Sequence, residues 1–306
     1  MEEKQGKLLP FLYETAPGRF LLRGLTHPAI SKIAGAFLDT RASTVLIHSY
    51  ARKYHIDLSL YEPVQYRSFN QFFTRKIKPE RRPFAMGAHD LPSPCDGKLT
   101  VFPITPDAQF TVKGQTYTLG TLLRDETLAA QFQGGYCFIF RLTVDDYHRY
   151  HYLDSGTKGE NIYLPGKLHT VRPIALLNRP VFCENSREYT VLHTDHFGTV
   201  VQVEVGALMV GRICNLHGAG PIQRGAEKGR FEFGGSTVIT LFQKDTVQPA
   251  PTFLARTAAD QETLLEETFD DNAGFADGNT MPGGWVSTGT YPFSRQRGSD
   301  FGLNAH

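Results

Sequence analysis

The stretch FEFGGSTVITLF, residues 231–242, contains two β-like runs separated by Gly234, Gly235 and Ser236. Apolar side chains alternate with others on both sides of the break, and the second run is rich in β-branched residues, which favour strands. Two interpretations of the break stay open from these residues alone. In the first it is a tight turn, because glycine allows positive φ without steric cost. In the second the backbone is strained so that the Ser236 hydroxyl lies beside a backbone carbonyl that it can attack.

The composition sets the limits for the rest of the chain. Its 306 residues are 41% hydrophobic and 21% charged, which is ample for one large domain with an apolar core. No run approaches the roughly 18 consecutive apolar residues of a membrane span, and the first residues lack a secretory pattern. The four cysteines lie 42, 46 and 31 residues apart, which matches no zinc or redox spacing. We therefore expect reduced thiols in a cytosolic setting.

The net charge of +1 is unevenly distributed along the chain. Residues 1–82 carry 14 Lys/Arg against 7 Asp/Glu, whereas residues 251–306 carry 3 against 8. Two apolar clusters with helical spacing lie in the basic part, at 20–25 and at 30–38. Basic amphipathic helices of this kind lie on a membrane surface or pack on the domain core, and these interpretations are not exclusive.

From about residue 90 the sequence changes to short β-like runs separated by Gly and Pro. The runs are YCFIF (136–140), VVQVEV (200–205), GALMVGRI (206–213) and STVITLF (236–242). There is no βαβ alternation and no internal repeat. We therefore expect an α+β fold, with N-terminal amphipathic helices followed by a mainly antiparallel, partly barrel-like β core. The expected organisation is a helical membrane-association region at 1–82, a β-rich catalytic domain at 83–250 and a loop-rich tail at 251–306.

Two further segments carry residues suited to chemistry. SPCDGKL (93–99) has Asp96 before a glycine, which is also an ordinary turn. DDYHRYHYLD (145–154) has His148 and His151 three residues apart, which share a face on a helical turn but not on a strand. No third ligand stands at a recognisable metal spacing, so we expect no metal site.

A serine, a histidine and an aspartate together are typical of nucleophilic catalysis. The nucleophile elbow of serine hydrolases reads G-x-S-x-G between a strand and a helix. Here Ser236 follows two glycines, opens a strand and has no glycine two residues later, which disfavours an ordinary hydrolase. The remaining target for its hydroxyl is the carbonyl of Gly235.

Five ordered segments resemble the phosphatidylserine decarboxylase family of self-cleaving, pyruvoyl-dependent proenzymes, over roughly residues 11–245. They are SFNQFFTRKIKPERRP (68–83), SPCDGKL (93–99), DDYHRYH (145–151), CENSREYTVLHTDHFGTVVQVEVGALMVGRI (183–213) and KGRFEFGGSTVITLF (228–242). In the last segment the family has a Gly-Ser-Thr triplet after Leu, Val or Gly, and this chain has Gly234 in the variable place. Residues 264–306 depart from the family's pattern.

The resemblance implies that the chain cleaves itself between Gly235 and Ser236. Ser236 is then both the nucleophile and the precursor of a covalent pyruvoyl cofactor. His151 acts as the base towards Ser236 and is oriented by Asp96, while His148 serves the decarboxylation. Attack on the Gly235 carbonyl turns the peptide bond into an ester, and β-elimination followed by hydrolysis leaves the pyruvoyl group and ammonia.

The implied products are a β chain of 1–235 and an α chain of 236–306, which are expected to remain associated. The implied reaction converts phosphatidylserine into phosphatidylethanolamine and CO2, with the pyruvoyl carbonyl taking up the electrons that CO2 leaves. A lipid substrate and the basic helices favour a peripheral protein on an anionic membrane surface, at the cytoplasmic face of the cell membrane. A homodimer is left open, and no nucleic acid partner is expected.

Three alternatives remain at this point. The first is a lipid-binding homologue that never cleaves, and the second is a pyruvoyl-dependent decarboxylase of a soluble amino acid. The third is a metal hydrolase that uses His148 and His151, for which the sequence offers no further ligands.

Overall fold

The computed structural model describes residues 8–81, 84, 87, 90–208, 212–234, 236–262, 286–287 and 303–305. Within these residues, N-terminal helices precede a mainly antiparallel β core. The predicted α+β class is therefore confirmed.

The helices are short and begin at recognisable signals. Those in the described residues are α1 (Leu8–Glu14), α2 (Ala16–Leu25), α3 (Pro28–Leu38), α4 (Val45–Lys53), α5 (Phe69–Phe73), α6 (Leu119–Leu123), α7 (Glu126–Ala130), α8 (Pro173–Asn178), α9 (Val181–Glu184) and α10 (Pro251–Glu262). Short 3₁₀ helices cover Arg41–Thr44, Leu58–Leu60 and Pro79–Arg81. Proline occupies the first turn of α2 and α3, and the Thr15 hydroxyl caps α2 by accepting from the Gly18 N–H at 3.0 Å.

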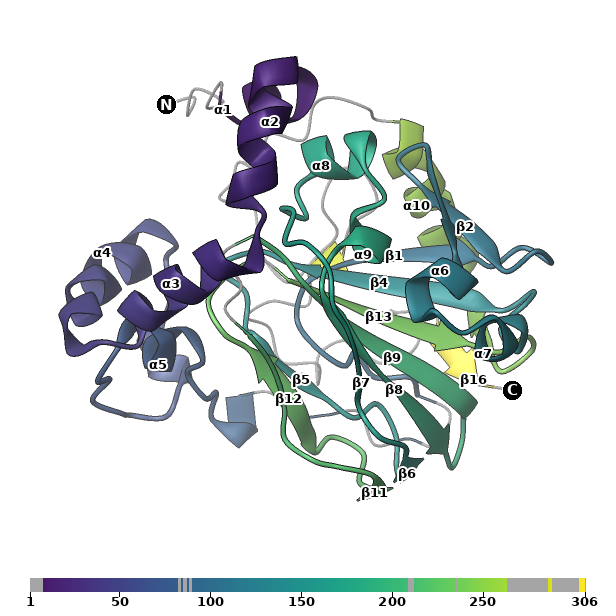
Figure 1. The fold of residues 1–306 in the computed structure, drawn as a ribbon. Coiled ribbons are helices and arrows are strands. Elements are labelled where there is room, and N and C mark those ends of the chain that lie inside the picture. Colours follow the sequence, from purple (N-terminus) through teal and green to yellow (C-terminus); the bar gives the residue numbers. More distant parts are fainter. Residues whose placement is uncertain are drawn as a thin grey trace.

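The N-terminal helices divide into two groups (Figure 1). The first, α1 and α2, packs on the main core through Leu12, Tyr13 and Leu22. The second, residues 28–73 with α3, α4 and α5, lies to one side of the sheets and is called the helical lobe below (Figure 1). Its own apolar core is formed by Leu38, Phe69, Phe72 and Phe73.

A large open sheet forms the centre of the molecule. The strands are β1 (Lys98–Pro103), β2 (Gln109–Val112), β3 (Gln115–Thr118), β4 (Tyr136–Leu142), β5 (Arg149–His151), β6 (Gly156–Lys158), β7 (Ile162–Leu164), β8 (Arg187–Thr194), β9 (Gly198–Gly206), β10 (Ile213–Asn215), β11 (Gly220–Ile222), β12 (Glu227–Phe231), β13 (Ser236–Phe242), β14 (Val247–Pro249), β15 (Val286–Ser287) and β16 (Leu303–Ala305). In the large sheet the order is β11-β6-β8-β9-β13-β4-β1-β15, with β7 beside β8, and these pairs are antiparallel. Among the described residues the sheet is not closed into a barrel, so the partly barrel-like character that the sequence predicted does not extend to closure.

The strand β13 lies in the middle of this sheet, between β4 and β9 (Figure 1). It pairs with both neighbours over its whole length, so that Ser236 stands opposite Leu142 and Gly206. All of its residues are buried. Its β-branched side chains suit a strand that is covered on both faces.

The break in FEFGGSTVITLF is a crossing between two sheets. β12 ends at Phe231 in a three-stranded sheet, β10-β12-β5, and β13 begins at Ser236 in the large sheet. Gly234 has a φ of +131°, a backbone conformation that residues other than glycine rarely adopt. Gly235 lies outside the described residues. The break is therefore not the tight turn that joins neighbouring strands of one hairpin.

Two other expectations differ from the structure. The predicted run at 206–213 is not one strand, because β9 ends at Gly206 and Leu208 lies in a turn. The Gly206 carbonyl accepts a hydrogen bond from the Asn185 side chain at 2.7 Å. At the end of β9 a side chain therefore makes a bond of the kind that a neighbouring strand makes earlier. The tail at 251–306 begins with α10, a helix that the sequence did not predict. In the part of the chain that the structure describes, no helix has the length and apolar character needed to cross a membrane.

Candidate active site

The hydroxyl of Ser236 lies next to the imidazole of His148. Ser236 Oγ is 3.3 Å from His148 Nδ1, and both residues are fully buried. His148 directly precedes β5 in the small sheet, and Ser236 opens β13 in the large sheet. The crossing of the chain between the two sheets thus brings together residues that are 88 positions apart.

The other ring nitrogen of His148 determines which tautomer is present. His148 Nε2 lies 2.9 Å from the backbone oxygen of Thr143, which can only accept a hydrogen bond. The proton therefore sits on Nε2 in the neutral ring, and Nδ1 is free to accept from the Ser236 hydroxyl. This arrangement holds the hydroxyl in one direction.

Burial keeps the His148 ring uncharged. The desolvation of the ring, with a smaller contribution from the positive charge of Arg75, lowers the pKa of His148 to about 3. The ring of Phe73 covers it, with 4.2 Å between the ring centroids. His148 is therefore a neutral imidazole at physiological pH and a weak base.

The structure also brings the Asp96 segment beside the two histidines. Asp96 is buried, and its Oδ2 accepts from the backbone N–H of Tyr147 at 3.3 Å. Two residues earlier, the Pro94 carbonyl accepts from the N–H of His151 at 2.7 Å. His151 is partly buried at the end of β5, where its ring stacks near that of Tyr147.

The predicted site residues thus come together from three segments of the chain. The contact that reaches Ser236 directly comes from His148, whereas the sequence assigned the base to His151. The division of roles between the two histidines stays a prediction. The predicted cleavage residue Gly235 lies outside the described residues. Among the residues that are described, no three His, Cys, Asp or Glu side chains form a group that could hold a metal ion.

The sequence did not identify the residues that hold the segment before Ser236. Phe233 packs against the core of the helical lobe, and its backbone N–H donates to Asn70 Oδ1 at 3.2 Å. Asn70 and Phe73 belong to the SFNQFF segment, which resembled the family but received no role. Thr143, which orients His148, was also missed, because a backbone carbonyl leaves no signal in the sequence.

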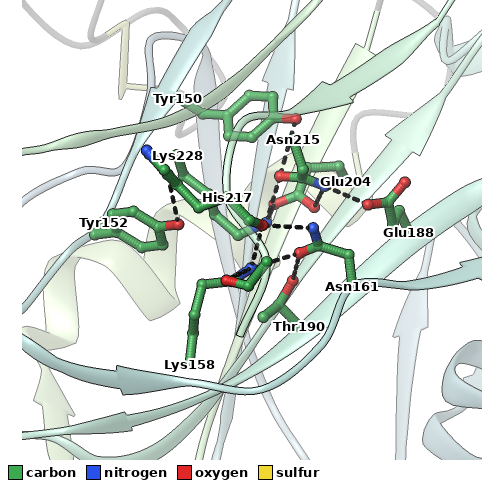
Figure 2. Close-up of polar contacts among 11 residues, drawn as sticks. Tyr150, Tyr152, Lys158, Asn161, Glu188, Thr190, Glu204, Asn215, His217 and Lys228 are labelled. Atoms are coloured by element: carbon green, nitrogen blue, oxygen red, sulfur yellow. Dashed lines mark hydrogen bonds and ion pairs between the residues drawn. The ribbon is translucent and has the colours of Figure 1, made fainter. Parts of the chain in front are cut away.

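A buried polar layer joins the two sheets (Figure 2). At its centre Lys228 Nζ on β12 lies 2.8 Å from Glu204 Oε1 on β9, and both side chains are fully buried. Asn215 on β10 accepts from Lys228 at 2.8 Å and donates to Glu188 on β8 at 2.8 Å. Burial raises the pKa of Glu204, an effect that the Lys228 charge opposes. The layer fixes β12, the strand that leads into the crossing, against the large sheet.

The polar layer continues towards β6, which lies next to the edge strand β11. Lys158 Nζ donates to Asn161 Oδ1 at 2.9 Å and to the His217 carbonyl at 2.8 Å (Figure 2). The Thr190 hydroxyl on β8 donates to the same Asn161 oxygen at 2.8 Å. Each of these buried polar groups thus has a partner, as burial requires.

Comparison with known proteins supports the resemblance. The sequence profile of the family described as phosphatidylserine decarboxylase matches residues 69–257. The chain is 43% identical over 267 residues to phosphatidylserine decarboxylase proenzyme 2 of Clostridium acetobutylicum, covering 86% of this chain and 91% of that protein. It is 41% identical over 266 residues to a phosphatidylserine decarboxylase proenzyme of Ruminiclostridium cellulolyticum, covering 85% and 89% of the two chains.

A third relative, a phosphatidylserine decarboxylase proenzyme of Desulfitobacterium hafniense, is 37% identical over 265 residues, which cover 85% of this chain and 89% of that protein. The residues that the family profile matches, 69–257, include strands β1 to β14 and every residue of the Ser236 site. This chain therefore belongs to the phosphatidylserine decarboxylase family.

Proposed function

We propose that this chain is a phosphatidylserine decarboxylase that is made as a proenzyme and cleaves itself between Gly235 and Ser236. The observation that carries the proposal is the buried Ser236 hydroxyl, held 3.3 Å from His148 Nδ1 and two residues after Gly234, whose φ is positive. A hydroxyl held in one direction, two residues after a glycine with positive φ, suits attack on the preceding carbonyl.

The self-cleavage uses groups of this chain and one water molecule. The Ser236 oxygen attacks the Gly235 carbonyl while a base takes the hydroxyl proton, and the amide nitrogen of Ser236 leaves as the ester forms. Loss of the Ser236 α-proton then breaks the bond from Cβ to the ester oxygen, which frees the β chain with a Gly235 carboxylate. Water then displaces the nitrogen, which leaves as ammonia, and the pyruvoyl group remains on the α chain.

The base is assigned to His151 and its orientation to Asp96. General bases work best when their pKa lies near the working pH, and the buried His148, with its pKa of about 3, is poorly suited. His151 is partly exposed, and its backbone is bonded to the segment that carries Asp96. His148 then has two tasks: it directs the Ser236 hydroxyl before cleavage, and it stands beside the reacting centre afterwards.

The pyruvoyl group fits this site because its carbon atoms are those of Ser236, which the sheet already holds. Once formed, the group supplies a carbonyl that binds the substrate amine and takes up the electrons that CO2 leaves. The neutral His148 lies at this position, where it can hold or return the proton that replaces CO2.

The α2–α4 region supports a membrane surface as the place where substrate is found. Its exposed apolar side chains are Phe20, Leu21, Leu25, Ile30, Ile33, Phe37, Val45 and Leu46. These residues are called the apolar surface below. Exposed arginines and lysines lie among them, including Arg23 and Lys32. Apolar side chains flanked by basic ones suit an anionic bilayer, and the proposed location is the cytoplasmic face of the cell membrane.

The proposal is tested by the covalent state of the purified protein and its activity on phosphatidylserine vesicles. We expect two chains on a denaturing gel, with masses for residues 1–235 and 236–306 and a pyruvoyl-blocked smaller chain. We expect them to co-purify under native conditions because β13 is bonded on both sides. The Ser236→Ala variant should remain one chain of 34.2 kDa and release no CO2.

Two of the alternatives have their own result in this experiment. A wild-type chain that stays whole contradicts self-cleavage and favours the non-cleaving homologue. A cleaved chain that releases CO2 from free amino acids but not from phosphatidylserine contradicts the proposed lipid substrate. It leaves the proposed self-cleavage unaffected.

A further inference from the structure

The segment before the cleavage site is held by three successive backbone N–H groups. The N–H of Phe231 donates to the His148 carbonyl at 2.9 Å, and that of Glu232 donates to the Arg212 carbonyl at 3.0 Å. The third, that of Phe233, donates to the side chain of Asn70 at 3.2 Å. This last bond is the closest of the three to the cleaved peptide bond, and a side chain makes it.

The amide of Asn70 is held in the orientation that this bond needs. Asn70 is buried, and its Nδ2 donates to Asp39 Oδ1 at 2.8 Å. Because a carboxylate accepts and a backbone N–H donates, the amide nitrogen must face Asp39 and its oxygen must face Phe233. Asp39 caps the C-terminal end of α3. The bond thus links a helix of the lobe to the segment before the cleavage site.

Aromatic packing fixes the same point of the chain. The Phe233 ring lies 5.2 Å from that of Phe69 and 5.1 Å from that of Phe73, in edge-to-face geometry. Phe73 is also the ring that covers His148. One short helix, α5, therefore contacts both the segment before the cleavage site and the histidine beside Ser236.

We infer that Asn70 is a positioning residue for the self-cleavage, an inference that rests on the proposed function. Its side-chain oxygen holds the Phe233 N–H, two residues before Gly235, and so limits where the Gly235 carbonyl can lie relative to Ser236 Oγ. Asp39 acts on the reaction only through Asn70, by setting the direction of its amide. A displacement of about 1 Å between reacting atoms is enough to slow a reaction by about a hundredfold.

The test follows the disappearance of freshly translated precursor on a denaturing gel. Asn70→Leu removes the oxygen that holds Phe233, and we expect cleavage to slow by about tenfold to a hundredfold. Asn70→Asp keeps an oxygen for Phe233 but places a second carboxylate against Asp39, and we expect a similar loss. The exchange Asn70→Asp with Asp39→Asn restores one donor and one acceptor between the two positions. It should return the cleavage rate to within about threefold of wild type.

Ser43→Ala is the matched control for general damage to the lobe. Ser43 is fully buried, and its hydroxyl accepts from the N–H of Phe69 at 2.8 Å, so it holds α5 through a bond that does not involve Phe233. We expect Ser43→Ala to lower the melting temperature as Asn70→Leu does, but to slow cleavage less than about threefold. Equal slowing by both variants, or no rescue by the exchange, overturns the inference. A wild-type chain that never cleaves overturns the proposed function itself, whereas equal rates for wild type and Asn70→Leu overturn only the role of Asn70.

Discussion

At the scale of single residues, the surroundings of His148 separate it from His151. His148 is covered by Phe73, bonded to Thr143 through Nε2 and fully buried, so that it stays neutral. His151 is partly exposed on the segment that adjoins Asp96. Three residues of separation in the sequence thus become two different environments, and these favour two different roles.

Alanine substitutions of the two histidines test this division. His151→Ala should slow precursor cleavage by about a hundredfold or more, because the base is lost. His148→Ala should slow cleavage by less than about tenfold, because only the direction of the Ser236 hydroxyl is lost, yet the cleaved protein should release CO2 poorly. Gel time courses and CO2 release measure the two steps separately. If the His148→Ala precursor stays uncleaved, His148 is the base and the roles must be exchanged.

The low pKa of His148 also predicts a dependence of stability on pH. In the unfolded chain this histidine takes up a proton below about pH 6.5, whereas in the folded chain it does so only near pH 3. The stability that depends on a neutral His148 is therefore fully present above about pH 6.5. It is lost progressively as the pH falls towards 3, because protonation then favours the unfolded chain. Between pH 7 and pH 5 the loss is about 2 kcal/mol.

The measurement uses the Ser236→Ala background, which keeps one covalent state. The free energy of unfolding is compared with that of the same chain carrying His148→Phe, which keeps a flat ring against Phe73. The difference between the two chains should shrink by about 2 kcal/mol from pH 7 to pH 5. A constant difference over this range would show that His148 is protonated in the folded chain as readily as in the unfolded one.

At the scale of elements, the decisive feature is that β12 and β13 belong to different sheets. The pair of Lys228 and Glu204, with Asn215 between the strands, fixes β12 against β9. This ion pair is fully buried, so water no longer solvates either charge. Each charge is therefore stabilised mainly by its attraction to the other. The layer thereby sets the distance that residues 232–235 have to cross.

Removal of one charge from this pair should be costly. Lys228→Met leaves Glu204 buried without its cation, and we expect the free energy of unfolding to fall by roughly 3–5 kcal/mol. Adding Glu204→Gln should recover part of this loss because the uncompensated charge is gone. Denaturant unfolding in the Ser236→Ala background measures both variants.

An exposed ion pair provides the control. Lys76 and Glu62 are 3.9 Å apart, with side chains that are 55% and 41% exposed. Lys76→Met should change stability by at most about 0.5 kcal/mol. If Lys228→Met costs no more than this control, the buried layer does not hold the two sheets together.

At the scale of the whole molecule, the helical lobe faces in two directions. Inwards it packs around Phe233 and His148, and outwards α3 and α4 contribute to the apolar surface. The side chains of Phe20, Ile33 and Val45 are 74%, 70% and 76% exposed. The helical lobe therefore contributes both to the packing around the reacting centre and to the proposed bilayer contact.

Substitution of these three side chains by serine should weaken binding to vesicles that contain an anionic lipid. Each apolar side chain of this size contributes roughly 1.5–3 kcal/mol when it is fully buried, so we expect at least a tenfold loss of affinity. Sedimentation with vesicles measures the effect. Binding of the wild type should also weaken as salt is added, because basic side chains contribute.

A matched control uses exposed apolar residues of the β core, one on β7 and one directly after β10. Tyr163 and Leu216 are 57% and 46% exposed, and neither belongs to the apolar surface. Serine at both positions should leave vesicle binding unchanged. Equal losses from the two sets of substitutions would mean that the apolar surface has no special part in membrane binding.

Much of the local structure was predictable because it depends on neighbours in the chain. The β-branched alternation of STVITLF corresponds to β13, YCFIF lies within β4, and VVQVEV lies within β9. The apolar spacing at 20–25 and 30–38 falls in α2 and α3. The strand predicted at 206–213 was wrong because a side chain, that of Asn185, takes the place of the next pairing partner at Gly206.

The chemical character of the site was likewise present in the sequence, in Asp96, the two histidines and the Gly-Gly-Ser step. Tertiary structure alone decided that His148 meets Ser236, that Phe233 enters the core of the helical lobe and that Lys228 pairs with Glu204. Strand and helix periodicity are properties of adjacent residues and can be read along the chain. Contacts between sheets depend on strand order and on which face each strand buries, and no local pattern contains that information.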